Sequence, residues 1–255
     1  MSRWRPLEMA YLPETRWAFG DVVLALGAGF AAAILAGSVM VAVTAADEIT
    51  VAQVTVTLLA QSAATVATLI GLGRSRGTGS LAERVGLAWR RSDTWGILAG
   101  LALQVVVAVL IGGLIRLLAP DELAQQAVAG VVGGASRWLE IVVLLVMLVG
   151  VAPVVEEIVY RAVLLSRLRR SMAPWPAILV SAAFFAGVHL IDPGALYAVP
   201  GLFVIGVALG WLALATGDIG LPIAVHAGVN LTGALALIFE DELAEAVDAV
   251  VHLVF

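Results

Sequence analysis

The chain has 255 residues, of which 62% are hydrophobic and 13% charged, and its formal net charge is −5. Soluble domains carry roughly 25% charged residues, so this composition excludes a chain whose surface faces water throughout and indicates a multi-pass membrane protein. The absence of cysteine excludes disulfides, thiolate catalysis and cysteine-bound metal sites.

Seven apolar stretches are each long enough to cross a membrane, which takes about 20 helical residues. In chain order they are residues 22–45, 49–73, 94–119, 139–168, 175–191, 196–216 and 221–239. We interpret the first as a retained membrane helix, because it is too long for the apolar part of a cleavable signal. All seven are predicted to be α-helices, since lipid tolerates only helices and closed barrels, and barrel strands are much shorter.

Two further segments leave the number of spans open. Residues 121–136 and 242–255 are apolar enough to lie at the membrane interface, and one of them could be an eighth span. The predicted fold class is therefore an all-α polytopic transmembrane helical bundle with about seven to eight membrane helices. The sequences GILAG (96–100) and GVALG (206–210) favour close packing of helices within this bundle.

Arginine placement predicts the orientation, because cytoplasmic loops of membrane proteins are enriched in basic residues. Most arginines precede the first span, separate the second from the third, or follow the fourth: Arg3, Arg5, Arg16, Arg74, Arg76, Arg84, Arg90, Arg91, Arg167, Arg169 and Arg170. Only Arg116 and Arg137 lie on the other side. We therefore expect an integral, multi-pass protein of the cell membrane with a cytoplasmic N-terminus and, for seven spans, a C-terminus outside.

The fourth span carries charges where lipid disfavours them, in the sequence VAPVVEEIVYRAVLL (151–165). Each charge at the centre of a membrane helix costs about 2.5–3.5 kcal/mol, so the three must be paired or face a wet cavity. Glu157 and Arg161 are four residues apart and can pair on one helix face. Glu156 is turned about 100° away and lacks that partner, which makes it a functional candidate. A span ending near Val155 would place the charges at its border, but the chain stays apolar well beyond them.

Two later spans carry histidines with a second notable residue on the same face. FFAGVHL places Phe185 and His189 four residues apart, and VHAGVN does the same for His226 and Asn230. A single histidine in an apolar helix is more often a packing residue. If the fourth and fifth spans form an antiparallel hairpin, however, Glu156 and His189 reach nearly the same depth. We therefore expect a carboxylate, two imidazoles and an amide to converge in the cytoplasmic half of the bilayer.

This set of side chains fits two kinds of hydrolytic site. A glutamate and a histidine can hold a water molecule and remove its proton, while a second histidine and an amide stabilise an oxyanion. The same residues could instead bind a divalent metal such as zinc through Glu156, His189 and His226, with water as the fourth ligand. The sequence leaves both alternatives open.

The motifs EExxxR, FxxxH and HxxxN occur in this order on separate apolar spans. Together they resemble the CPBP family of CAAX-processing and bacteriocin-processing intramembrane endopeptidases, also called the Abi or type II CAAX protease family. The resemblance covers roughly residues 137–240. It implies eight helices, a cavity open to the cytoplasm and a glutamate- or metal-dependent endopeptidase.

The resemblance also assigns roles to individual residues. It implies that Glu156 and His189 activate the water and that His226 and Asn230 form the oxyanion site. The implied partners are a peptide or lipidated protein substrate and the lipid bilayer. Nucleic acid is not expected as a partner, and the oligomeric state is left open.

Three more site residues and a division of the chain follow from the same resemblance. Glu157 and Arg161 would complete and brace the first motif, and Phe185 would pack beside His189. The expected divisions are N-terminal membrane helices and loops (1–136), a protease-like core (137–240) and an acidic amphipathic tail (241–255).

Two other functions compete with the endopeptidase. A non-catalytic membrane scaffold or bacteriocin-immunity protein would keep the motifs for packing. A proton-coupled transporter would use Glu156 and the histidines as a relay. The transporter is the least favoured, because the sequence shows no internal repeat.

Overall fold

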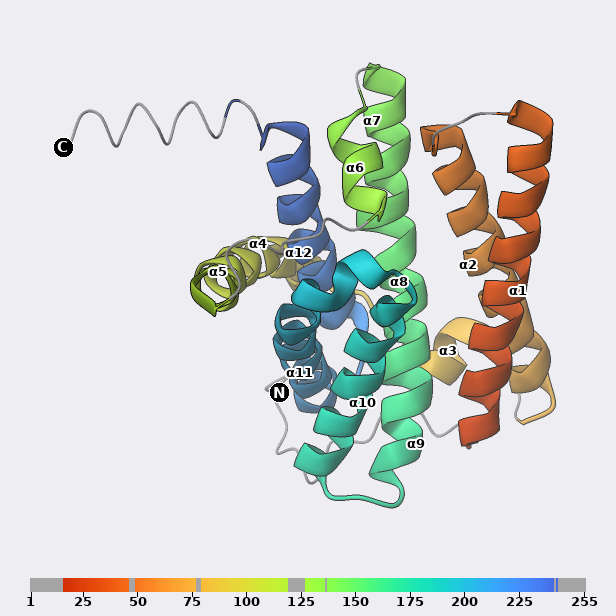
Figure 1. Ribbon diagram of the computed structural model, residues 1–255. Coiled ribbons are helices and arrows are strands. Elements are labelled where there is room, and N and C mark those ends of the chain that lie inside the picture. Colours follow the sequence, from red (N-terminus) through yellow and green to blue (C-terminus); the bar gives the residue numbers. More distant parts are fainter. Residues whose placement is uncertain are drawn as a thin grey trace.

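The computed structural model describes residues 16–45, 49–76, 79–118, 127–135, 137–240 and 242. Within these ranges every regular element is helical. Seven helices are long and apolar enough to cross a membrane: Phe19–Thr44, Val51–Arg74, Arg91–Ile115, Trp138–Arg169, Pro174–Ile191, Gly194–Thr216 and Gly220–Ile238. They match the seven predicted spans to within a few residues, so the prediction of an all-α polytopic bundle is confirmed (Figure 1).

Several of these spans are composite. The α-helices are α1 (Phe19–Thr44), α2 (Val51–Arg74), α3 (Leu81–Val85), α4 (Gly96–Val107), α5 (Gly113–Leu118), α6 (Ala127–Gly133), α7 (Trp138–Leu145), α8 (Ala152–Glu157), α9 (Ser166–Arg169), α10 (Pro174–Val188), α11 (Val199–Thr216) and α12 (Gly220–Ile238). Three π-helical stretches (Ala108–Gly112, Val146–Val151, Ile158–Leu165) and three 3₁₀ turns (Arg91–Trp95, His189–Ile191, Pro193–Ala198) join them. The fourth span thus runs from α7 through α9.

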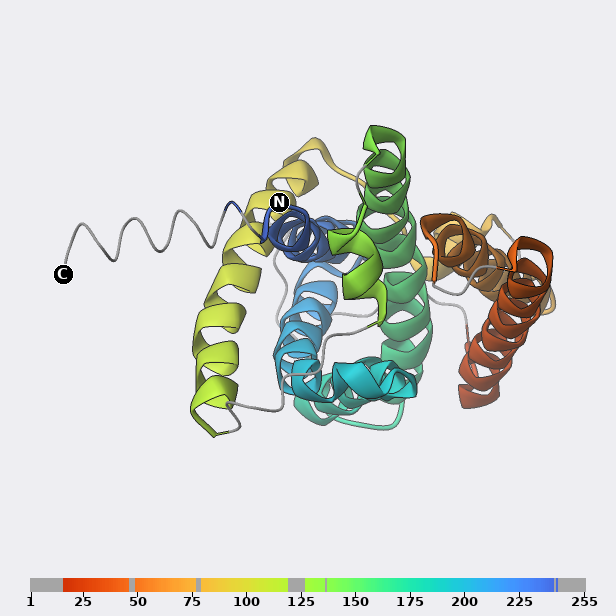
Figure 2. The same ribbon diagram turned by 45° about the horizontal axis from the view of Figure 1, so that its top comes forward.

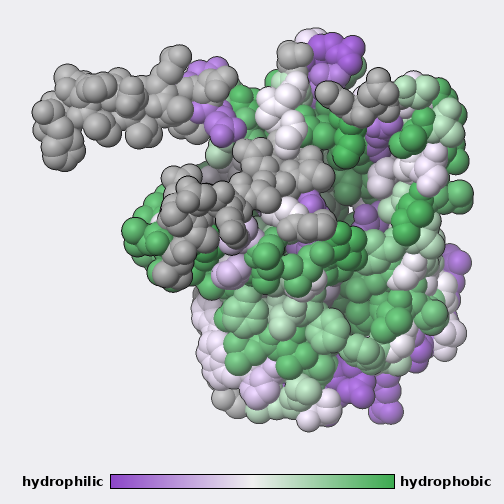
Figure 3. All heavy atoms as spheres, viewed as in Figure 1, coloured by the Kyte–Doolittle hydropathy of each residue, from purple (hydrophilic) through white to green (hydrophobic). Residues whose placement is uncertain are grey.

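The outer surface of the bundle is apolar, as contact with lipid requires. Large hydrophobic side chains such as Ile34, Leu35 and Val109 are exposed. Figure 3 shows hydrophobic residues over most of the visible face and hydrophilic ones gathered toward its ends. Because exposing this much apolar surface to water is unfavourable, a surface of this kind is stable only in a membrane. The protein is an integral, multi-pass membrane protein.

The fourth span lies at the centre of the bundle (Figures 1 and 2). It contacts the α1–α2 hairpin on one side and α10, α11 and α12 on the other. The stretch Ile158–Leu165 is buried throughout. Arg161 in this stretch and Glu157 just before it are therefore enclosed by neighbouring helices and do not face lipid.

Pro153 opens the backbone of the fourth span just before the two glutamates. The Ala152 N–H donates to the Met147 carbonyl, five residues back. The next residue, Pro153, has no N–H to donate. The Leu148 carbonyl consequently lacks a donor from its own helix and is free to accept a hydrogen bond from another. A π-helical stretch of this kind is often found at functional sites.

Two glycines allow α4 and α12 to pack backbone against backbone. A Cβ added to Gly100 would collide with the Val225 carbonyl, and one added to Gly228 would collide with the Ile97 carbonyl. Because the contacts of α4 advance along α12 in the same order, the two helices run parallel. The sequence GILAG at 96–100 therefore acts in packing within the bundle, as predicted.

Most of the described arginines gather at one end of the bundle, which we call the arginine-rich end. It holds the start of α1, the end of α2 and the α9–α10 turn at the bottom of Figure 1. Arg137 precedes α7 at the opposite end. Of the segments considered for an eighth span, residues 127–133 form the short helix α6 against α12. Residues 121–126, 136 and 243–255 lie outside the described residues.

Candidate active site

A buried ion pair braces the fourth span. Arg161 Nη1 donates to Glu157 Oε1 at 2.8 Å, and both side chains are 0% exposed. Arg161 Nη2 donates to the Gly206 carbonyl of α11 at 3.2 Å. The guanidinium also lies over the Phe185 ring, 4.6 Å from its centroid. The predicted pairing of Glu157 with Arg161 is thus observed, and it fastens α8 to α10 and α11.

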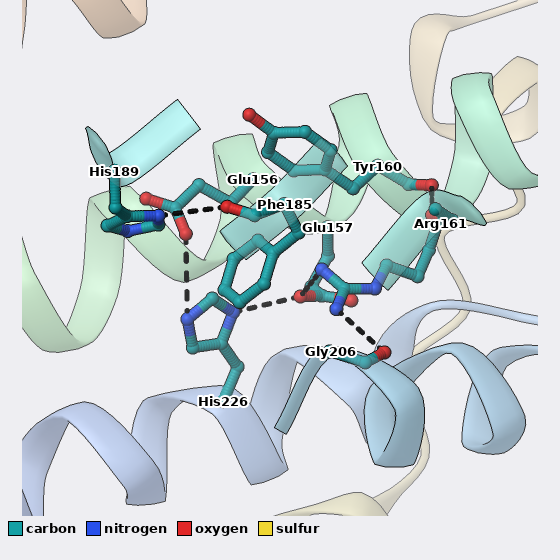
Figure 4. A network of polar contacts seen from close by, with 9 residues as sticks. Glu156, Glu157, Tyr160, Arg161, Phe185, His189, Gly206 and His226 are labelled. Carbon is teal, nitrogen blue, oxygen red and sulfur yellow. Dashed lines mark hydrogen bonds and ion pairs between the residues drawn. The ribbon is translucent and has the colours of Figure 1, made fainter. Parts of the chain in front are cut away.

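His226 lies between the two glutamates (Figure 4). Its Nδ1 is 2.8 Å from Glu157 Oε1, and its Nε2 is 3.6 Å from Glu156 Oε2. Glu157 already accepts from Arg161 as a carboxylate, so the imidazole donates Nδ1–H to it. This bond fixes the tautomer and ring orientation and turns Nε2 toward Glu156. A separation of 3.6 Å is too long for a direct hydrogen bond but allows a bridging water.

His189 is fixed in a comparable way. Its Nδ1 is 2.9 Å from the carbonyl of Phe185, one turn earlier on α10. With Nδ1–H donated to that carbonyl, Nε2 is left as an acceptor. The Phe185 ring packs edge-on against both imidazoles, with centroids 5.3 Å from His189 and 5.5 Å from His226. Phe185 therefore packs beside His189, as the resemblance implies, and also contacts His226 and Arg161.

Asn230 is anchored to the opened backbone of the fourth span. Its Nδ2 donates to the Leu148 carbonyl at 2.8 Å. This is the carbonyl that Pro153 leaves without a donor in its own helix. The amide has a second N–H that this bond does not use.

A cavity of about 610 Å³ joins these residues. Its wall includes Glu156, His189, His226 and Asn230, with apolar side chains of α4, α11 and α12 around them. The Glu156 carboxylate is 30% exposed, in contrast to fully buried Glu157. Glu157 therefore has structural contacts, whereas Glu156 is accessible from the cavity.

Part of the chain also matches a known family. Residues 137–232 match the model of the family described as type II CAAX prenyl endopeptidase Rce1-like. This segment is Rce1-like. The match confirms the resemblance recognised from the three motifs, all of which lie within it. No curated protein and no solved structure matches the chain. The match makes this segment similar to a family described as CAAX prenyl endopeptidases.

The Rce1-like segment does not account for the whole cavity. The helix α4, which precedes the segment, contributes Gln104 to the wall. Sequence reasoning missed this residue, although an amide within an apolar span is a recognisable signal. It also missed Pro153, whose position inside a predicted helix signals an opened backbone.

The predicted zinc ligands are not drawn together into one cluster among the described residues. Glu156, His189 and His226 share the cavity, but among the described residues no three acidic or imidazole side chains are grouped to hold a metal ion. The Nδ1 contact of His226 with Glu157 leaves Nε2 available to a metal as well as to water. Because the described residues show no such cluster, we derive no step through a metal, and zinc binding stays a prediction.

Proposed function

We propose that the protein is an intramembrane endopeptidase whose water molecule is held between Glu156 and the two imidazoles. The observation that carries this proposal is the pairing of an accessible Glu156 carboxylate with a histidine Nε2 at a water-bridging distance of 3.6 Å. Glu156 has no role in packing comparable to that of Glu157. A partly exposed carboxylate kept at membrane depth is a functional candidate by default.

The proposed oxyanion contact needs a proton on His226 Nε2 in addition to the Nδ1–H that bonds to Glu157. With that proton in place, the formal charges of Glu156, Glu157, Arg161 and His226 sum to zero.

The residues then divide the work of hydrolysis. Glu156 takes a proton from the water while His189 Nε2 accepts the other water hydrogen, and the oxygen adds to the scissile carbonyl carbon. His226 Nε2–H and the second Asn230 N–H donate to the resulting oxyanion. When the carbon–nitrogen bond breaks, Glu156 gives its proton to the leaving amine.

The apolar cavity wall favours a lipidated or membrane-associated peptide as substrate. We expect purified protein in liposomes to cleave a fluorogenic farnesylated peptide ending in a C-a-a-X sequence, and to cleave its unprenylated form more slowly. Folded protein that cleaves neither peptide would overturn this assignment. Cleavage abolished by a chelator and restored by zinc would overturn the metal-free step.

Orientation decides from which side the substrate is reached. From the level of Glu156 and His226, the cavity wall extends along α12 to Leu237 and along the third span to Ile115, away from the arginine-rich end. With that end in the cytoplasm, as the arginines favour, the apolar part of the cavity lies in the outer half of the bilayer. The cytoplasmic opening implied by the resemblance would require the reverse orientation.

The cysteine-free chain makes the orientation directly testable. We expect a single cysteine at Ser171, in the α9–α10 turn, to react with a membrane-impermeant maleimide only from the cytoplasmic side of sealed vesicles. A cysteine at Ile49, before α2, should react only from the other side. The reverse labelling pattern would overturn the arginine-based orientation and place the apolar part of the cavity in the cytoplasmic half.

The scaffold alternative is favoured by one observation. The contacts of Glu157 with Arg161 and His226 join the fourth span to α12, and the Arg161 contact with Gly206 extends this link to α11. A packing role alone would require these residues. It would not require Glu156, so substitution of Glu156 separates the two functions.

A further inference from the structure

Gln104 lies on the cavity wall but outside the Rce1-like segment. It is on α4, one turn after Gly100, whose backbone touches α12 beside Val225 and Gly228. Because α4 and α12 run parallel, one further turn of about 6 Å brings Gln104 level with Asn230. Both residues line the same cavity. The glycine contact therefore fixes Gln104 at a defined depth beside the proposed site.

The amide oxygen of Gln104 is buried without a hydrogen-bond partner among the described residues. Leaving a buried acceptor unpaired is unfavourable, whereas methionine would fill similar space without that cost. The neighbours of Gln104 on the wall are apolar, among them Val107, Ala108 and Ile111. Packing therefore does not explain an amide here, and a ligand that supplies a donor would.

We propose that Gln104 binds the substrate backbone by accepting a hydrogen bond from a peptide N–H. This inference rests on the proposed endopeptidase function. A peptide that enters a cavity in the membrane loses its water, so each of its N–H groups needs an acceptor. His226 and Asn230 offer donors, which suit the scissile carbonyl. The Gln104 oxygen offers the complementary acceptor, and its terminal torsion is soft enough to turn the oxygen into the cavity.

The test compares Gln104→Met with Gln61→Met, the same substitution on α2 at a residue that is not part of the cavity wall. The probe is the farnesylated C-a-a-X peptide, together with a set in which each uncleaved backbone amide is replaced in turn by an ester. We expect Gln104→Met to raise KM about threefold to tenfold with little change in kcat, as expected for one lost hydrogen bond. Gln61→Met should leave both constants unchanged.

The ester set identifies the donor. With native Gln104, one ester peptide should bind about threefold to tenfold more weakly than the parent peptide. With Gln104→Met, the same ester peptide and the parent peptide should bind equally well. Binding is measured in a Glu156→Gln background, so that the peptides stay intact. Equal KM in the two methionine variants, or no ester peptide with this pattern, would overturn the role of Gln104 while the function stands. Wild type that neither binds nor cleaves the parent peptide would overturn both.

Discussion

Replacing Glu156 with glutamine should lower the cleavage rate by about 10²- to 10⁴-fold, because a positioned general base contributes this much to hydrolysis. Glutamine keeps the size of the side chain but cannot accept the proton of the water. The protein should remain folded, since Glu156 is 30% exposed and the buried ion pair belongs to Glu157. The measurement is the initial rate of peptide cleavage at matched protein concentration, with thermal unfolding in detergent as the check on folding.

Glu140→Gln is the matched control. Glu140 lies on the same span as Glu156 but near its start, where it pairs with Arg137 instead of lining the cavity. It should therefore retain wild-type cleavage. Comparison of protein termini in membranes from cells with wild type, Glu156→Gln or no copy extends the test to natural substrates. If Glu156→Gln retains cleavage in vitro, the proposed base is wrong. If the protein termini are the same in all three membranes while Glu156→Gln rescues a deletion phenotype, the scaffold function is favoured.

The parts of the fold that depend on local composition could be predicted from the sequence. Runs of apolar residues located all seven spans, because lipid requires about 20 helical residues for each crossing. Helical periodicity also predicted the Glu157–Arg161 pair, since residues four apart share one face. Both inferences need only the number of residues along a single helix, without any knowledge of neighbouring helices.

The contacts between spans could not be predicted in the same way. The resemblance implies that Glu156 works with His189, and the structure adds His226, 70 residues away in the chain, whose Nε2 lies 3.6 Å from Glu156 Oε2. The link between Glu157 and His226 depends on how α12 is rotated against α8, which periodicity does not specify. That rotation follows from close contacts such as Gly228 against Ile97. Tertiary packing therefore determined that the Glu157 carboxylate, and not that of Glu156, bonds to His226 Nδ1.

Asn230 illustrates the same limit at the level of the backbone. Its anchor is a carbonyl that is free only because Pro153, five residues later, has no N–H. The proline was visible in the sequence VAPVVEE, but its consequence for residue 148 depends on the local π-helical hydrogen bonds. An opened helix can then serve as a fixed acceptor for a neighbouring span.

Replacing Arg161 with methionine should destabilise the protein by about 3–5 kcal/mol, the usual cost of removing one partner from a buried ion pair. The carboxylate of Glu157 would remain buried, and the Gly206 carbonyl would lose its contact with the guanidinium. The measurement is the free energy of unfolding in mixed detergent, with peptide cleavage followed in parallel. Arg167→Met is the control, since Arg167 lies at the arginine-rich end and, within the described part of the chain, bonds to nearby Ser171.

The double variant Glu157→Gln/Arg161→Met separates stability from chemistry. It removes both charges, so most of the lost stability should return, because an uncharged pair leaves no buried charge without a counterion. Cleavage should stay low, since the glutamine no longer holds His226 as a carboxylate does and Nε2 loses its fixed orientation. Recovery of cleavage together with stability would mean that the ion pair serves packing alone. Stability without cleavage would establish that the carboxylate buried beside Arg161 orients the histidine that faces the cavity.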